Sequence, residues 1–287
     1  DLVGKAGCLI ISVFYAQYFL IAGVFLCTTM TGMLHANFLF KTPEWAFLLA
    51  GLPVFGYSAY KGPTNVARVF ELYGVVFLIG LLIVHANMLI QGDVDNIRPL
   101  VIPSETGQVF GAMKEAIISF LGIEILTVLP FSKRNKKAPR VAFLTLLGIG
   151  LIYVLVVESS IMMVGIHEIT YNEYPLITAF RQVQLKHIEF LRRVDVLYLT
   201  IGIMGIFIVI SVLYMAVVEY VSRLIPKVNR VAVVVTVGVM IFIISFIGFN
   251  IRNFDEILTM YITYAGFLTA GAIPIVLWSI AKVKKYA

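Results

Sequence analysis

Hydrophobic residues occur in long blocks along this chain, and short polar segments separate the blocks. A helix that crosses the hydrocarbon core of a bilayer needs about 20 mainly apolar residues. Several blocks reach that length without a single Asp, Glu, Lys or Arg, namely residues 9–34, 72–92, 196–218, 231–251 and 257–281. This pattern predicts transmembrane helices.

Three further blocks are less regular. Residues 45–60 are interrupted by glycine and proline, residues 141–166 are apolar apart from one glutamate, and residues 112–131 contain three charged residues. Each is still long enough to be interpreted as a span. We therefore expect an all-α integral membrane protein, with eight transmembrane helices in a single transmembrane domain over residues 1–287.

Composition agrees with a membrane protein and excludes an ordinary soluble globule. Hydrophobic residues make up 60% of the 287 residues and charged residues only 13%, whereas soluble domains have about 25% charged residues. The formal net charge is +6. Because the apolar residues come in long blocks and do not alternate with the charges, membrane topology explains this excess better than nucleic-acid binding does.

The distribution of Lys and Arg between alternate loops predicts the orientation, because cytoplasmic loops collect these residues. The side that holds the N-terminus has Lys5, Lys61, Arg68, Lys133, Arg134, Lys136, Lys137, Arg140, Arg223, Lys227, Arg230, Lys282, Lys284 and Lys285. The opposite side has Lys41, Arg98, Arg181, Lys186, Arg192, Arg193 and Arg252. This 14 to 7 division predicts that both termini are cytoplasmic.

The longest connection, residues 167–193, has a helical pattern of its own. Leu176, Phe180, Val183 and Ile188 fall close to one face, and polar residues lie off it. We interpret the segment as an external amphipathic helix. It either lies in the membrane interface or forms a lid over a central cavity.

No pattern typical of an enzyme is present. The chain lacks a glycine-rich phosphate loop, a nucleophile elbow and a His-Glu-x-x-His motif, and its four histidines are dispersed at positions 35, 85, 167 and 187. We expect no catalytic residue, no metal site and no cofactor. His35 and His85 are interpreted as hydrogen-bonded histidines near the outer ends of their spans rather than as proton-relay residues.

Gly122 and Glu124 lie at the middle of the block 112–131. An ionisable group at that depth costs at least about 2.5 kcal/mol on insertion scales, so it normally faces the bundle interior or a water-filled cavity. Glycine permits an interrupted helix, whose free peptide groups can bind small ligands. The alternative is structural: Glu124 pairs with a cation or a hydroxyl on a neighbouring helix, and Gly122 allows close packing.

Two other features have both a structural and a functional interpretation. Tyr15 and Tyr18 lie near the middle of the first span, with Ala22 a turn further on, and they either pack as aromatic core or line a ligand pocket. Glu219 lies four positions before Arg223, which predicts a local ion pair.

Three stretches together carry a family resemblance: ISFLGIEILTVLP at residues 118–130, DNIRP at residues 95–99 and GPTNVAR at residues 62–68. The chain resembles the B subunit of spore germinant receptors, permease-like proteins of the amino acid-polyamine-organocation superfamily. The resemblance covers nearly the whole chain, and the stretch around Gly122 is its most specific part.

The resemblance implies an inverted-repeat transporter fold of ten spans, of which this sequence contains helices three to ten and lacks the first two. It places Leu121 and Gly122 at the interruption of helix six, with Tyr18 and Ala22 facing it from helix three. Phe267 falls in the part of helix ten that closes the pocket. Glu124 is added because it is an acid in the middle of an apolar block. The candidate ligand-binding residues are therefore Tyr18, Ala22, Leu121, Gly122, Glu124 and Phe267.

Two functions remain open. The first is a receptor subunit that binds a small germinant, expected to be an amino acid, and acts with A and C subunits in the spore inner membrane. The second is a secondary transporter that moves an amino acid with a proton, for which Glu124 or Glu158 would be a suitable acid.

The predicted topology can be tested by labelling single cysteines in a variant without Cys8 and Cys27. A cysteine at Asn135, in the loop expected to be cytoplasmic, should resist an impermeant thiol reagent in right-side-out membranes. A cysteine at Asn172, in the connection expected to be external, should react. The reverse labelling pattern would contradict this orientation.

Overall fold

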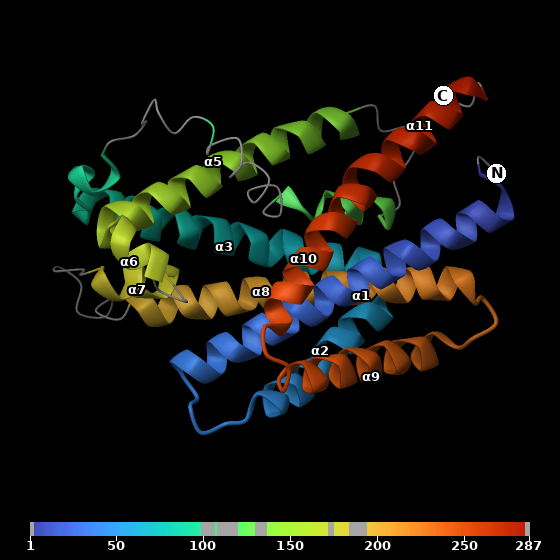
Figure 1. Cartoon of the computed structure of the whole chain (residues 1–287), viewed down its shortest axis with the longest axis horizontal. Coiled ribbons are helices and arrows are strands. Elements are labelled where there is room, and N and C mark those ends of the chain that lie inside the picture. Colours follow the sequence, from blue (N-terminus) through green and yellow to red (C-terminus); the bar gives the residue numbers. More distant parts are fainter. Residues whose placement is uncertain are drawn as a thin grey trace. The chain divides into compact units, whose positions relative to one another are not determined.

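A computed structural model describes residues 3–98, 107, 120–129, 137–171, 175–183 and 194–284 of the chain. All regular structure within these ranges is helical (Figure 1). The elements are α1 (Gly4–Asn37), α2 (Glu44–Lys61), α3 (Pro63–Gln91), η1 (Val94–Ile97), η4 (Ile123–Thr127), α5 (Ala138–Val164), α6 (Ile166–Tyr171), α7 (Pro175–Gln182), α8 (Val194–Leu224), α9 (Arg230–Gly248), α10 (Phe254–Gly266), η6 (Phe267–Ala272) and α11 (Ile273–Val283).

Six stretches of helix in the described ranges are long and apolar enough to cross a bilayer. They lie in α1, α3, α5, α8, α9 and the continuous run from α10 to α11, and they correspond to six of the expected spans. The chain is therefore an integral membrane protein. Residues 45–60 do form a helix, α2, which is not among the six. Half of the block 112–131 lies outside the described residues, so the total of eight spans stays a prediction.

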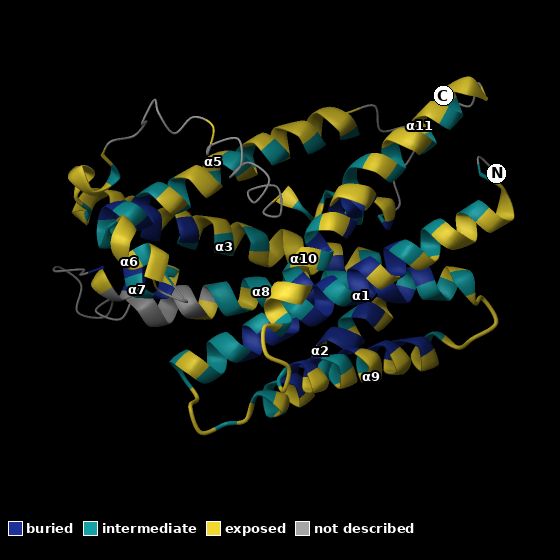
Figure 2. Cartoon of the chain, in the orientation of Figure 1, coloured by how far each residue is buried: buried dark blue, intermediate teal, exposed yellow. Residues whose placement is uncertain are grey.

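The chain divides into two compact units. Unit 1 comprises Asp1–Phe70, Met113–Pro130 and Ile206–Ala287, and unit 2 comprises Glu71–Ala112 and Phe131–Gly205. Within unit 1, α1 packs against α2, α9 and α10. Its middle turns are buried, as the dark blue of Figure 2 shows. Because α1 is surrounded by other helices, polar groups on its middle turns need partners within the protein.

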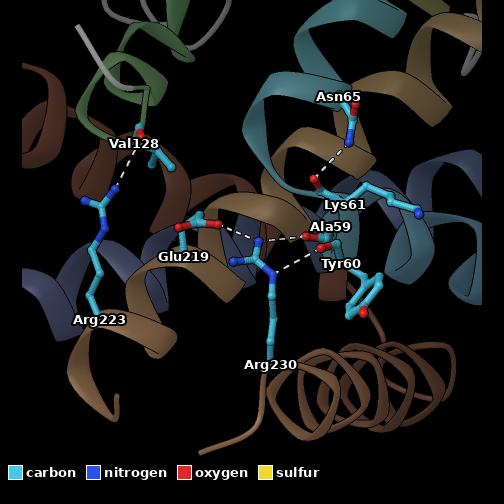
Figure 3. Close-up of polar contacts among 8 residues, drawn as sticks. All are labelled: Ala59, Tyr60, Lys61, Asn65, Val128, Glu219, Arg223 and Arg230. Atoms are coloured by element: carbon cyan, nitrogen blue, oxygen red, sulfur yellow. Dashed lines mark hydrogen bonds and ion pairs between the residues drawn. The ribbon is translucent and has the colours of Figure 1, made fainter. Parts of the chain in front are cut away.

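Polar contacts fasten the end of α2 to the start of α9 within unit 1 (Figure 3). Gly62 ends α2 with φ +83°, and the last carbonyls of a helix need partners outside it. Arg230 supplies them: Nε donates to the Tyr60 carbonyl at 3.2 Å, and Nη2 donates to the Ala59 carbonyl at 3.0 Å. Nη2 also pairs with Glu219 at 2.5 Å.

The expected pair between Glu219 and Arg223 is therefore wrong. Glu219 pairs instead with Arg230, eleven positions away in the chain, while Arg223 Nη2 donates to the Val128 carbonyl at 3.5 Å. The physical reason is that Arg230 can satisfy a carboxylate and two helix-end carbonyls together, which a local pair within α8 cannot do.

Unit 2 contains a buried polar contact of its own. His85 on α3 is fully buried, and its Nδ1 lies 2.7 Å from Ser159 Oγ on α5, so this histidine is hydrogen-bonded as expected. Nearby, Asn96 Nδ2 donates to the Met162 carbonyl at 2.9 Å. These contacts join the end of α5 to α3 and η1.

The amphipathic segment that we expect to be external is partly described, as helices α6 and α7. Phe180 and Val183 are buried as the helical pattern predicts, but Leu176 is 37% exposed and Ile177 is buried instead. Ile188 lies outside the described residues. The buried face of α7 is therefore rotated relative to the expected one, because Ile177 and Ala179 pack inward together with Phe180.

Replacing Glu219 by Gln should destabilise unit 1, because Arg230 then lacks the anion opposite its partly buried guanidinium. Side-chain exposures of 34% for Arg230 and 15% for Glu219 lead us to expect a loss of about 1–3 kcal/mol in the free energy of unfolding. Arg98→Gln is the control, since its pair with Asp95 is 67% and 78% exposed and worth about 0–1 kcal/mol. Equal melting temperatures of the two purified variants would contradict this assignment.

Candidate functional site

The candidate site lies in unit 1 and begins at a break in regular structure. Gly122 has φ +123° and ψ −17°, a backbone conformation that L-residues with a side chain rarely adopt. The chain then enters the short 3₁₀ helix η4, in which Ile125 N donates to the Gly122 carbonyl at 3.1 Å. A Cβ on Gly122 would meet no atom within 4 Å. Glycine is therefore needed here for its conformation and not for close packing.

Glu124 is the buried acid of the site, with only 4% of its surface exposed. The Tyr18 hydroxyl of α1 donates to Oε1 of Glu124, and the backbone N–H of Gly122 donates to Oε2 at 2.9 Å. No described Lys or Arg forms an ion pair with this carboxylate. Both oxygens are thus engaged by neutral donors, although a carboxylate can accept further hydrogen bonds.

A second set of hydrogen bonds links the backbone of Glu124 to α8. Thr127 Oγ1 donates to the Glu124 carbonyl at 2.7 Å and lies 2.7 Å from the Tyr220 hydroxyl. Since threonine has one hydroxyl proton, Tyr220 is the donor in the second bond. Arg223, one turn beyond Tyr220, donates to the Val128 carbonyl. The end of η4 is therefore held by two side chains of α8.

A wide helical turn also contacts the site. Residues Phe267–Ala272 form a π-helix between α10 and α11, and such turns occur frequently at functional sites. The Tyr15 hydroxyl donates to the Thr269 carbonyl at 2.6 Å, which joins this turn to α1. A Cβ on Gly266 would lie 2.5 Å from Cδ1 of Leu121. Leu121 therefore packs directly on the Gly266 backbone.

The structure brings together most of the residues expected from the sequence. Tyr18 and Glu124 are in direct contact, Gly122 donates to the same carboxylate, and Leu121 lies against the turn that precedes Phe267. Ala22 lies one turn beyond Tyr18 on α1, with 9% of its surface exposed. Phe267 itself is 43% exposed. Whether these residues bind a ligand stays a prediction.

Sequence reasoning missed several participants. Thr127 lies three positions after Glu124, a spacing typical of a local hydroxyl contact, and could have been found. Tyr220 had no such signal, because it lies 93 positions from its partner Thr127. The bond from Tyr15 to Thr269 had none either, since these residues are 254 positions apart. Tyr220 also stacks on Tyr15, with ring centroids 5.6 Å apart.

The negative charge of Glu124 can attract an ammonium group. The N–H of Gly122 already donates to this carboxylate, and the rings of Tyr15 and Tyr18 are 3% and 2% exposed. The contacts of the two tyrosine hydroxyls are already made within the protein. A ligand that engages Glu124 must therefore compete with Tyr18 or add to its contact.

Comparison with known proteins identifies relatives across the chain. The family model described as Spore germination protein matches residues 1–254. Spore germination protein YndE of Bacillus subtilis (strain 168) is 26% identical over 99% of this chain and 77% of its own length. Spore germination proteins A2 and KB of the same organism are 29% and 25% identical, over 69% and 66% of this chain. The alignments cover only 54% and 51% of those two proteins.

Gly122→Ala should destabilise the protein through its backbone alone, because φ +123° is strained for alanine while no atom opposes the added methyl group. We expect a loss of about 1–3 kcal/mol in the free energy of unfolding. Gly148→Ala, in α5, is the matched control: it also has open space but lies within a helix, where alanine is favoured by about 0.5–1 kcal/mol. Thermal unfolding in detergent should give shifts of opposite sign, and shifts of the same sign would contradict the role of Gly122.

Proposed function

This chain belongs to the spore germination protein family, and from that premise we propose that it is the germinant-sensing membrane subunit of a spore germination receptor. Its ligand is a small molecule with an ammonium group, of which an amino acid is the simplest case. The observation that carries the proposal is the Gly122 break with the buried Glu124 beside it, held by Tyr18.

The chemistry of the site supports an amino acid as ligand. Glu124 provides the negative charge for an ammonium group, and the peptide N–H of Gly122, once released by Glu124, suits a carboxylate. Leu121 is half-buried and offers apolar surface to a side chain. Because Leu121 packs on Gly266, its size also sets how much room a ligand has beside the π-helical turn.

The contacts of η4 supply a way for ligand binding to be sensed elsewhere in unit 1. A ligand that draws the Glu124 carboxylate away from Tyr18 moves the start of η4. The other end of η4 is bonded through Thr127 to Tyr220 and through Val128 to Arg223. Both side chains belong to the last turns of α8, on the side assigned to the cytoplasm by the charge distribution. Displacement of η4 would therefore reach that side.

The membrane, partners and orientation that we propose for this subunit follow from its proposed role as a receptor subunit. It acts in the spore inner membrane together with A and C receptor subunits, has both termini in the cytoplasm, and performs no enzymatic reaction. The signal is a change of conformation, which agrees with a site made of hydrogen-bond donors, one acid and apolar surface.

A proton-coupled amino-acid transporter is the second candidate. The observation in its favour is that the carboxylate of Glu124 lies buried without a described cationic partner, an arrangement that suits an acid which takes up and releases a proton. Uptake of a labelled amino acid into proteoliposomes separates the candidates. Uptake driven by a proton gradient supports the transporter, and ligand binding without uptake supports the receptor.

The receptor proposal predicts how substitutions of Glu124 act. Glu124→Gln keeps the size and removes the charge, so it should abolish stabilisation by the amino acid that raises the melting temperature of the wild-type full-length protein. Glu256→Gln is the control, since Glu256 is exposed in the first turn of α10. Spores with the Glu124 variant should also fail to germinate in response to that amino acid, while the protein stays in the membrane.

Leu121→Phe tests the pocket independently of charge, because a larger side chain beside Gly266 should weaken the response to the amino acid. Leu34→Phe is the control for protein abundance, since Leu34 is also partly buried but lies near the end of α1. A fully responsive Glu124→Ala variant at normal abundance would refute the proposed site. Equal losses of response and abundance in Leu121→Phe would indicate a packing role only.

A further inference from the structure

A groove of about 560 Å³ lies between α2 and α9 in unit 1, away from the Glu124 site. Its walls run from Leu49 to Tyr60 on α2 and from Val231 to Phe242 on α9. Tyr214 of α8 contributes to its floor, and the ring is 2% exposed. The Tyr214 hydroxyl donates to the Val234 carbonyl at 2.6 Å, so its polar atom is already satisfied. The groove is therefore suited to hydrocarbon.

Two glycines keep the groove open. A Cβ on Gly56 would lie 3.3 Å from Cγ1 of Val234, and a Cβ on Gly238 would lie 2.5 Å from the Tyr214 hydroxyl oxygen. Any larger residue would crowd the contact between α2, α8 and α9 and fill the floor. In addition, Pro53 lies inside α2, where it removes one backbone hydrogen bond on the groove side of the helix.

The length of the groove matches a single hydrocarbon chain. Each wall spans twelve residues, a rise of about 17 Å at 1.5 Å per residue, which is close to half of the roughly 30 Å hydrocarbon core. The groove therefore has the length of one bilayer leaflet, as one acyl chain does.

The mouth of the groove is aromatic and cationic. Tyr57 and Tyr60 are 65% and 46% exposed, and tyrosines of this kind are enriched at the membrane interface. The Nζ atom of Lys61 lies 5.3 Å from the ring centroid of Tyr57, and no described carboxylate pairs with it. Arg230 is neutralised by Glu219. Lys61 therefore leaves a net positive charge at the mouth, which favours an anion.

We propose that this groove binds one acyl chain of an anionic phospholipid, with the phosphate group beside Lys61. The chain lies along Pro53, Gly56 and Gly238, and the head group stays at the level of Tyr57 and Tyr60. Such a lipid would lie against α9 and the end of α2, where Arg230 joins the two helices. The proposal is independent of the germinant site, because no residue is shared between them.

The test measures the melting temperature of the full-length protein in detergent, with added dioleoyl-phosphatidylglycerol or dioleoyl-phosphatidylcholine. The wild-type protein should be stabilised more by the anionic lipid. Lys61→Gln should weaken the apparent affinity for the anionic lipid about fivefold, the effect of one cationic residue near an anionic surface. Arg68→Gln removes an exposed cation on the same predicted side and should leave the affinity unchanged.

Val239→Trp fills the groove from its exposed edge and should abolish stabilisation by either lipid. Met240→Trp is the matched control, since Met240 is 43% exposed, lies next to Val239 on α9, and does not line the groove. Equal stabilisation of the wild-type protein by both lipids would overturn the proposal. So would unchanged lipid stabilisation of Val239→Trp, or equal stabilisation by glycerol 3-phosphate, which has no acyl chain.

Discussion

The constraint on which the candidate site depends is the burial of a carboxylate among neutral hydrogen-bond donors. Glu124 is 4% exposed, and a buried polar group without partners costs several kcal/mol. Its partners come from two sources: the hydroxyl of Tyr18 and the peptide N–H of Gly122. The peptide N–H reaches the carboxylate two residues on because the chain at Gly122 leaves helical geometry. The helix break at Gly122 thus provides a hydrogen-bond donor that the buried Glu124 needs. Together with the bond from Tyr18, it holds η4 against α1.

The same rule for polar groups in an apolar medium organises the end of unit 1 where α2 stops. Three carbonyls there accept side-chain donors: Arg230 bonds two of them and Asn65 bonds the third, that of Lys61, at 3.1 Å. Within the hydrocarbon region a helix satisfies its own backbone, and at its end other groups must do so. Arg230 thus fixes the spacing of α2 and α9, and that spacing leaves the groove between them.

Unit 1 therefore contains two regions of opposite character. The site around Glu124 is polar and buried, with an acid, three tyrosine hydroxyls and an irregular backbone. The groove between α2 and α9 is apolar, with the Tyr214 hydroxyl turned to a carbonyl and the charge confined to the mouth. The first suits a small charged molecule and the second a hydrocarbon chain. α8 borders both, because Tyr220 contacts η4 and Tyr214 contributes to the groove floor.

The sequence by itself determined the class of protein, six of its apolar helices and the family, because each depends on composition, block length or local motif. It also singled out Gly122 and Glu124, since a glycine and an acid in an apolar block are visible without a structure. Only the tertiary structure decided which side chains form hydrogen bonds and ion pairs with each other. The bonds from Tyr15 to Thr269 and from Glu219 to Arg230 join distant segments, and nothing local distinguishes Arg230 from Arg223 as the partner of Glu219. Helix packing makes that choice, because it determines which donor can also reach the carbonyls at the end of α2.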